Sequence, residues 1–395
     1  MIAAAEIEAL LAGLDQVGRS PTGFRRLAWT PEEATARAWF ERQAGRLGLA
    51  VERDRAGNLW ACPPAPPPWR GVGSHLDTVA GGGRYDGALG VACAFAVAAR
   101  FDGPLAVVSF ADEEGARFNT PTFGSRALVG RLDAEEALAR SDAEGTTMAA
   151  AMRAAGLRPE ELADAGEALA RLSSFVEVHI DQSRELAEAG LPAGAVTALA
   201  GRMRVAVVIE GEADHAGTTR RSERSDAMAA AARLIVAAEE LADDPRFVVT
   251  PTRLLVEPNA LSTIAGEVRL WLDARAAEIA AVDAWREALA VAAVELGRER
   301  RVRIELTTAS RSPGRRFDES LKRALLDGLE ACGVEPTETV CFAGHDAGVL
   351  AERIPAGMVL VRNPTGVSHS PAEEVDVADA AVAADVVLAA LRELG

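Results

Sequence analysis

Several informative kinds of residue are scarce in this sequence. Its 395 residues include only four cysteines, and no two of them are spaced as a pair. We therefore expect free thiols in a reducing cytoplasm rather than a disulfide framework. No stretch is apolar over enough residues to span a bilayer. Residues 1–16 carry acids in place of the basic region that opens a signal peptide, so a cytoplasmic location is expected.

Positive charge is also in short supply. The 42 lysines and arginines are outnumbered by 59 acidic residues, which gives a net charge of −17. This balance argues against nucleic acid and against an anionic membrane as partners. The chain length suggests two or three domains and is ample for a hydrophobic core.

Histidine is also scarce, with only five residues. A lone histidine is usually structural, but here each one lies beside glycine, acid, serine or threonine clusters rather than within an apolar helix face. That setting favours a chemical role for the group. The five histidines are His75, His179, His215, His345 and His369.

The glycine-rich stretch 73–90 contains one of these histidines. It follows a short segment that could end a strand and closes in an alanine-rich segment of helical character, 88–100. His75, Asp77 and Asp86 fall inside it, and its glycines allow tight bends. Imidazole and carboxylates on one loop suit a divalent cation such as zinc or manganese. A glycine-rich turn with incidental polar residues explains this stretch equally well when it is considered alone.

An acidic segment follows the most apolar of the expected strands. Residues 104–110 form a continuous apolar run, which is typical of a strand buried in a parallel sheet. Asp112, Glu113 and Glu114 come directly afterwards. Consecutive acids are usually a solvated turn, but a bound cation would make them favourable here, and that interpretation is preferred.

Two more expected strands also lead into histidines. Residues 175–180 carry His179 near their end, and residues 357–361 precede a loop that contains His369. Open parallel sheets place their sites outside the carboxyl ends of the strands. Together with the segments after residues 72 and 110, four strands obey this rule. The sequence therefore predicts an α/β catalytic domain with a mixed, mostly parallel sheet and a metal site at one edge.

The middle of the chain predicts a different module. Its elements follow the order β-α-β-β-α-β, which is the ferredoxin-like pattern. We expect residues 201–309 to be an inserted α+β domain, with 1–200 and 310–395 forming the discontinuous catalytic domain. The expected elements of the insertion are 203–210, 225–242, 247–257, 267–275, 278–296 and 301–307.

Local signals predict the remaining elements of the first domain. Thr30, Pro31 and Glu33 form a strong helix start, with Thr30 as N-cap and Glu33 closing a capping box. That helix should extend to about residue 47. The other expected elements are a helix over 2–14, a strand or hairpin over 49–61, a mostly helical region over 132–172 and a helix over 319–332.

Eight motifs spread along the chain resemble those of one known family. Together they are similar to the M20 metallopeptidase-like superfamily, and specifically to its hydantoinase/carbamoylase branch. That branch includes N-carbamoyl-L-amino acid hydrolases, allantoate amidohydrolases and β-ureidopropionases. The motifs occupy residues 73–78, 83–90, 112–115, 179–182, 215–219, 273–275, 344–347 and 368–371.

The resemblance implies two divalent metal ions in each chain, which could be zinc, manganese, cobalt or nickel. His75, Asp86 and His179 would bind one ion, and Asp86, Glu114 and His369 would bind the other. A carboxylate can offer one oxygen to each of two close cations, which then activate a shared water.

The resemblance also assigns catalytic roles. Glu113 would be the general base that later returns its proton to the departing nitrogen. Asp77 would orient the His75 imidazole, although a turn-capping aspartate is a competing explanation. His215 would reach the other subunit's site and stabilise the oxyanion, which requires a homodimer; a capping histidine is the alternative.

Substrate binding is the part in which the chain departs from the family pattern. Arg275 would grip the substrate carboxylate, against a default of a surface ion pair, and Gln182 would contact the polar head. Ser262 replaces the family's substrate-binding asparagine, and whether nearby Asn259 compensates is left open. The other departures are Asp181, Ser183, Arg220 and the pair Cys341 and Phe342.

The function implied is that of a two-metal amidohydrolase acting on a small ureido or carbamoyl acid. The leading substrates are N-carbamoyl-L-amino acids, cleaved to amino acid, carbon dioxide and ammonia, and residues 83–86 resemble the carbamoylase version of their motif. Allantoate or another ureido acid is the runner-up. A dipeptidase or aminoacylase is disfavoured by His179, because peptidase branches more often use an acid there. An inactive metal-binding homologue is disfavoured because Glu113 and every metal ligand are present.

Overall fold

The computed structural model describes residues 1–395, which form two compact units. Unit 1 consists of Met1–Thr197, Arg316–Thr339 and Ala343–Gly395, and unit 2 consists of Ala198–Arg315 with Val340–Phe342. The insertion expected at residues 201–309 falls within unit 2.

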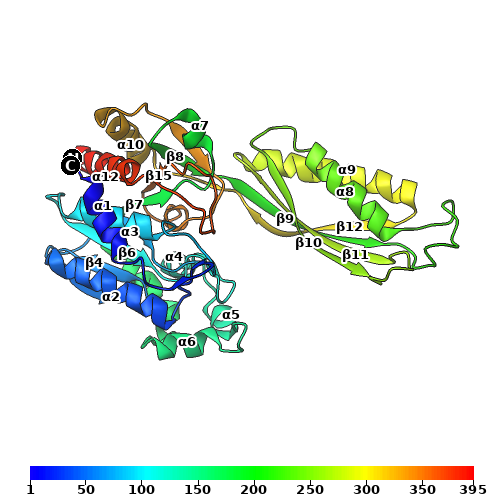
Figure 1. Ribbon diagram of the computed structural model, residues 1–395, viewed down its shortest axis with the longest axis horizontal. Helices are drawn as coiled ribbons and strands as arrows, with labels where there is room; N and C mark the ends of the chain where they lie inside the picture. Colours follow the sequence, from blue (N-terminus) through cyan, green and yellow to red (C-terminus); the bar gives the residue numbers. More distant parts are fainter. The chain divides into compact units, whose positions relative to one another are not determined.

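Unit 1 is built on a nine-stranded mixed sheet of order β13-β8-β15-β7-β5-β6-β4-β3, with β14 paired to β8 (Figure 1). The adjacent strands β15, β7, β5 and β6 are parallel, whereas β8, β4 and β3 pair antiparallel with their neighbours. The expected mostly parallel central sheet is therefore confirmed. The strands are β3 (Ala50–Arg53), β4 (Leu59–Cys62), β5 (Trp69–His75), β6 (Leu105–Phe110), β7 (Leu172–Ile180), β8 (Ala193–Leu199), β13 (Arg315–Arg316), β14 (Glu338–Cys341) and β15 (Ala356–Val361).

The helices of unit 1 bury the faces of this sheet. Helix α3 is apolar all round because it packs on the sheet and also against α1 and α12. None of the helices combines the length and the apolar character needed to cross a bilayer. The helices are α1 (Ala4–Ala12), α2 (Pro31–Arg46), α3 (Ala88–Ala98), α4 (Phe123–Leu128), α5 (Ala134–Ala139), α6 (Met148–Ala154), α7 (Glu185–Ala189), α10 (Glu319–Ala331), α11 (Asp346–Leu350) and α12 (Val377–Glu393); a short hairpin joins β1 (Arg19–Ser20) to β2 (Gly23–Phe24).

The local predictions for unit 1 hold with two corrections. Thr30 caps α2 by accepting the N–H of Glu33 at 3.4 Å, but the Glu33 carboxylate accepts the N–H of Trp29 rather than that of Thr30. The region 132–172 is not mostly α-helical. It contains the short helices α5 and α6 and a 3-10 segment, Pro159–Arg171.

Unit 2 is a four-stranded antiparallel sheet of order β10-β11-β9-β12, covered on one face by two helices (Figure 1). Burial alternates along β9, so that Met203 and Val205 face the helices while Arg202 and Arg204 lie on the opposite face. The element order is the β-α-β-β-α-β order expected from the sequence. The elements are β9 (Gly201–Glu210), α8 (Ala227–Glu240), β10 (Val248–Glu257), β11 (Glu267–Ala276), α9 (Ile279–Arg300) and β12 (Arg303–Ser312).

Candidate active site

The carboxyl ends of four parallel strands converge at one edge of the unit 1 sheet. His75 is the last residue of β5, and His179 is the penultimate residue of β7. The acidic segment follows β6 directly, and the loop with His369 follows β15. Because these four strands are parallel neighbours, their carboxyl ends lie together. The fold thus brings together the polar segments that the sequence placed on separate loops.

The first cluster at this edge consists of His75, Asp86 and His179. Asp86 Oδ1 lies 3.3 Å from His75 Nε2 and 3.1 Å from His179 Nε2, and all three side chains are buried. The other nitrogen of each ring is engaged by backbone: His75 Nδ1 lies 3.1 Å from Asp77 O, and His179 Nδ1 lies 2.9 Å from Ile180 O. A carbonyl at Nδ1 fixes the tautomer in which Nε2 carries the free lone pair.

The second cluster shares Asp86 with the first. Asp86 Oδ2 lies 3.6 Å from His369 Nε2, and Glu114 Oε2 lies 3.4 Å from the same nitrogen. The His369 side chain is about 50% exposed, so this cluster opens toward solvent whereas the first does not. Each oxygen of Asp86 therefore faces a different cluster.

The chemistry of these donors fits two divalent cations. His75 Nε2 and Glu114 Oε1 are buried and have no hydrogen-bond partner. Burial, with the nearby charge of Asp86, raises the pKa of Glu114 to about 8. Two bound cations would give these two atoms a partner and keep the carboxylates ionised. Imidazole nitrogens with carboxylate oxygens suit zinc, manganese, cobalt and nickel alike.

Asp77 joins the two segments that supply these ligands. Its Oδ1 accepts the N–H of Glu113 at 3.2 Å, and its Oδ2 accepts the N–H of Glu114 at 3.1 Å. Its Oδ1 also lies 3.6 Å from His75 Nδ1. The carboxylate thus makes the contacts of a turn-capping aspartate while it lies beside the imidazole that it was predicted to orient.

Glu113 belongs to neither cluster but borders the first. Its Oε2 lies 3.8 Å from His75 Nε2, and its side chain is 9% exposed. Burial raises the pKa of Glu113 well above its usual range; His75 opposes this shift, and Asp346 and Glu114 add to it. A carboxyl group with a raised pKa is suited to accept and then release a proton near neutral pH.

Gln182 contacts the shared carboxylate through a small polar network. Its Nε2 donates to Asp86 Oδ2 at 3.2 Å and to Ser368 Oγ at 3.0 Å. Ser368 Oγ in turn donates to Asp86 Oδ2 at 3.3 Å. Ser368 was not among the predicted site residues, although its place directly before His369 was a usable signal.

A second contact that the sequence did not reveal fixes the Asp86 loop. Glu373 Oε2 accepts the N–H groups of Tyr85 at 2.8 Å and of Asp86 at 3.0 Å. Glu373 lies four residues after His369 on the loop that follows β15. The loop that bears His369 is therefore tied to the loop that bears Asp86.

His345 is buried beside His179 of the first cluster. The ring of His345 is centred 4.3 Å from that of His179, and neither of its nitrogens has a hydrogen-bond partner. Burial, together with His179, lowers the pKa of His345 well below its usual range, so this ring is neutral. Glu177 is also near, but its two oxygens accept from Ser74 Oγ at 2.9 Å and from the N–H of Ala347 at 2.8 Å.

The departure at Asp181 is explained by local structure. Its Oδ1 accepts both the N–H and the hydroxyl of Ser183 at 2.8 Å, and its Oδ2 accepts the N–H of Leu186 at 3.4 Å. Asp181 and Ser183 therefore stabilise the turn into α7 together. The expectation that they belong to an altered substrate-binding set is not supported by these contacts.

Arg84 also has a structural partner set. Its guanidinium pairs with Glu8 at 2.8 Å and with Asp15 at 2.6 Å. These acids belong to α1 and the segment after it, so Arg84 fastens the Asp86 loop to the N-terminal region. Within residues 83–86, the motif that resembles the carbamoylase version, Arg84 thus anchors the loop.

The remaining predicted residues lie in unit 2. His215 is exposed, and its Nδ1 accepts the N–H groups of Gly217 at 3.0 Å and Thr218 at 3.2 Å. This is the capping arrangement that was the alternative to a catalytic role, and it leaves Nε2 as the donor nitrogen. Ser262 and Asn259 are exposed, and the carbonyl of Ser262 accepts the N–H of Ala216 at 2.8 Å. Ser262 thus lies against the His215 turn.

Arg275 lies elsewhere in unit 2, on β11. Its Nε donates to Asp273 Oδ1 at 2.7 Å, and one terminal nitrogen donates to the carbonyl of Phe342 at 2.6 Å. The guanidinium is therefore held in a fixed orientation by an ion pair within unit 2.

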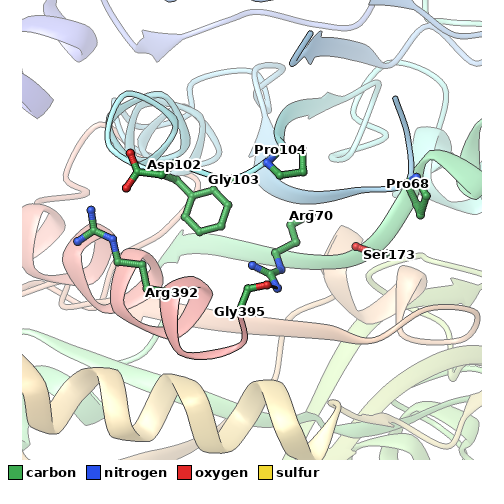
Figure 2. Close-up of a pocket in the computed structure, with 9 residues that line it drawn as sticks. Pro68, Arg70, Asp102, Gly103, Pro104, Ser173, Arg392 and Gly395 are labelled. Atoms are coloured by element: carbon green, nitrogen blue, oxygen red, sulfur yellow. Dashed lines mark hydrogen bonds between the residues drawn. The ribbon is translucent and has the colours of Figure 1, made fainter. Parts of the chain in front are cut away.

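A pocket of about 370 Å³ lies apart from these clusters, at the amino-terminal ends of β5 and β6. Figure 2 shows Arg70 directed at Gly395 in its wall. Arg70 donates to the carbonyls of Leu391, Leu394 and Gly395, and Arg392 donates to that of Arg100. These cations already have partners, and none of the predicted site residues lines the pocket.

Comparison with known proteins identifies the family of this chain. Residues 54–393 match the family described as Peptidase family M20/M25/M40. An N-carbamoyl-L-amino acid amidohydrolase of Geobacillus stearothermophilus is 39% identical over 388 residues, which cover 95% of each chain. An allantoate amidohydrolase of Bacillus subtilis (strain 168) is 32% identical, covering 91% of this chain and 90% of that one. The solved structure of a hydantoinase/carbamoylase family amidase from Burkholderia ambifaria has a TM-score of 0.88 at 33% identity, covering 99% of this chain and 97% of that one.

The chain therefore belongs to the peptidase family M20/M25/M40, whose members are metal-dependent. More narrowly, it is a hydrolase of carbon–nitrogen bonds, of the amidohydrolase type.

Proposed function

We propose that the protein is a homodimeric, two-metal amidohydrolase that cleaves N-carbamoyl-L-amino acids to amino acid, carbon dioxide and ammonia. The observation that carries this proposal is the division of the two Asp86 oxygens between two donor clusters, with the Glu113 carboxyl beside the first.

The metal ligands would be His75, Asp86 and His179 for one cation and Asp86, Glu114 and His369 for the other. When bound, two such cations would supply Lewis acidity toward the ureido carbonyl and ease the deprotonation of water.

The Glu113 carboxylate performs the proton transfers of the reaction. It takes a proton from the attacking water and returns it to the departing nitrogen, so that ammonia leaves and the carbamate that remains loses carbon dioxide. Its buried position beside His75 keeps the proton within the site. Asp77 holds the segment of Glu113 and Glu114 through their backbone N–H groups.

Unit 2 supplies the dimerisation and lid functions in this proposal. Arg275 grips the substrate carboxylate, and Gln182 of unit 1 contacts the polar head, with Asn259 and Ser262 near the substrate. His215 of one protomer donates from Nε2 to the developing oxyanion in the site of its partner. The capped Nδ1 of His215 supports this role because it leaves Nε2 protonated.

The choice of substrate is supported by the relative from Geobacillus stearothermophilus, which is named for N-carbamoyl-L-amino acids and is 39% identical. Allantoate is the second candidate, supported by the Bacillus subtilis relative at 32% identity.

Ammonia release from the manganese-loaded protein tests the substrate. N-carbamoyl-L-amino acids and allantoate are offered side by side, with a chelator-treated sample as control. Turnover of a carbamoyl amino acid that disappears with chelator supports the proposal, and turnover of allantoate alone favours the second candidate. If neither substrate is turned over although two metals are bound per chain, both candidate functions are contradicted.

Mixed dimers test the action of His215 across protomers. The variants His215→Ala and Glu113→Gln are each expected to be inactive. In a heterodimer of the two, the site with an intact Glu113 receives an intact His215 from its partner. Recovery of activity on co-expression is therefore expected, whereas no recovery would place His215 in its own chain's site or outside the reaction.

A further inference from the structure

The outer face of the unit 2 sheet carries a row of arginines that the mechanism does not fully use. In the antiparallel pairing of β9 with β11, Arg202 lies opposite Arg275, and Arg204 lies opposite Asp273. Directly opposed residues on one sheet face have their side chains within contact range. This row lies where the chain enters and leaves unit 2, since β9 begins at Gly201 and β12 ends at Ser312.

The single acid in this row is already shared by two of the arginines. Asp273 Oδ2 pairs with Arg204 Nε at 3.0 Å, and Asp273 Oδ1 pairs with Arg275 Nε at 2.7 Å. The Arg202 side chain makes no hydrogen bond or ion pair, although the residue is only partly exposed. Three guanidinium groups thus surround one carboxylate, in a chain whose net charge is −17.

The unpaired state of Arg202 is energetically unfavourable without a further anion. Like charges directly opposite each other on a sheet destabilise it. Burial and the neighbouring Arg204 lower the pKa of Arg202; Asp273 opposes this shift, and Arg275 adds to it. The Arg204 side chain is about 53% exposed and is paired with Asp273, which leaves Arg202 as the cation of this row that lacks a partner.

The orientation of Arg275 leaves room for such an anion. Its Nε and one terminal nitrogen are engaged by Asp273 and by the carbonyl of Phe342, which fixes the plane of the guanidinium. Its remaining N–H donors, with those of Arg202 across the strand pair, can hold two carboxylate oxygens.

We propose that Arg202 is a second carboxylate-binding residue, and that Arg202 and Arg275 together clamp the carboxylate of the ureido acid. The inference rests on the proposed function and adds a specificity determinant to it. Substrates that lack a free carboxylate should leave both cations without a partner and bind poorly.

The variant Arg202→Gln tests the clamp. Steady-state kcat and KM are measured for an N-carbamoyl-L-amino acid and for its primary amide. Loss of one charge-assisted contact should raise KM for the acid roughly tenfold or more while kcat changes little. The amide, which cannot use the clamp, should show no further rise.

The control variant is Arg269→Gln, which removes another arginine from the same sheet face. Arg269 pairs with Glu267 at 2.6 Å and lies six residues before Arg275 on β11. It should behave like wild type. Thermal melting of Arg202→Gln should match or exceed that of wild type because the substitution relieves repulsion. An unchanged KM, or equal rises for acid and amide, would overturn the proposal.

Calorimetry separates this inference from the proposed function. If the wild-type protein turns over no ureido acid, the proposed function fails by itself. Binding of the same acid to the metal-free protein then still tests the clamp. Weaker binding by Arg202→Gln than by wild type and Arg269→Gln supports it, and equal binding, or no binding to wild type, refutes it.

Discussion

Replacement of Glu113 by glutamine is the sharpest test of the catalytic assignment. Glu113 lies outside both donor clusters, with its Oε2 3.8 Å from His75 Nε2. Glutamine has nearly the same volume, so packing should be preserved, but it cannot accept a proton. Loss of a general base typically costs about 100- to 10,000-fold in rate. We therefore expect kcat to fall by that factor, which corresponds to about 3–5 kcal/mol of transition-state stabilisation.

The assay combines ammonia release with elemental analysis of bound metal. Glu113→Gln should retain the metal content of the wild type while losing turnover. The matched variant is Glu114→Gln, which changes the neighbouring residue and a predicted metal ligand, so it should lose metal as well as activity. Turnover close to wild type in Glu113→Gln with metals still bound would refute the assignment of the base.

Three further predictions concern the metal clusters and the scaffold. Asp86→Ala should lose both metals because its two oxygens face different clusters, whereas His369→Ala should lose only one. Elemental analysis counts the bound ions in each variant. Equal loss of metal from the two variants would contradict a ligand shared by both clusters. Asp181→Ala should lower the free energy of unfolding, measured by chemical denaturation, by about 1 kcal/mol because it removes a capping group. The KM should stay unchanged. A raised KM would mean that Asp181 belongs to the substrate site. Gly73→Ala should sharply lower the melting temperature, since the added Cβ would lie 1.8 Å from the carbonyl oxygen of Val108. A melting curve like that of the wild type would show that β5 and β6 can separate enough to accommodate the methyl group.

The convergence of the candidate site could be predicted from the sequence because it depends on local patterns and one topological rule. Short apolar runs mark buried strands, and each run here leads into His75, Glu113 with Glu114, His179 or His369. Parallel strands bring their carboxyl ends to one edge, so the loops had to meet once the sheet formed. The β-α-β-β-α-β order of unit 2 follows from the same local signals.

The partners of individual side chains could not be predicted in this way. Glu373 holds the backbone of Asp86 across 287 residues of sequence, and no local pattern encodes that contact. Asp181 looked like a change in substrate binding, yet its carboxylate caps the turn into α7 together with Ser183. Such contacts depend on which segments pack together and on how each loop is directed.

Outside residues 132–172, the sequence by itself therefore determined the main helices and strands, their order and the edge at which the polar loops gather, because these follow from hydrophobic periodicity and from the parallel pairing of buried strands. Only the tertiary structure decided that each oxygen of Asp86 faces a different cluster and that Arg202 lies opposite Arg275. The physical reason is register: shifting a strand by one residue turns its side chains to the other face, and packing of the whole sheet, rather than any local preference, selects one register.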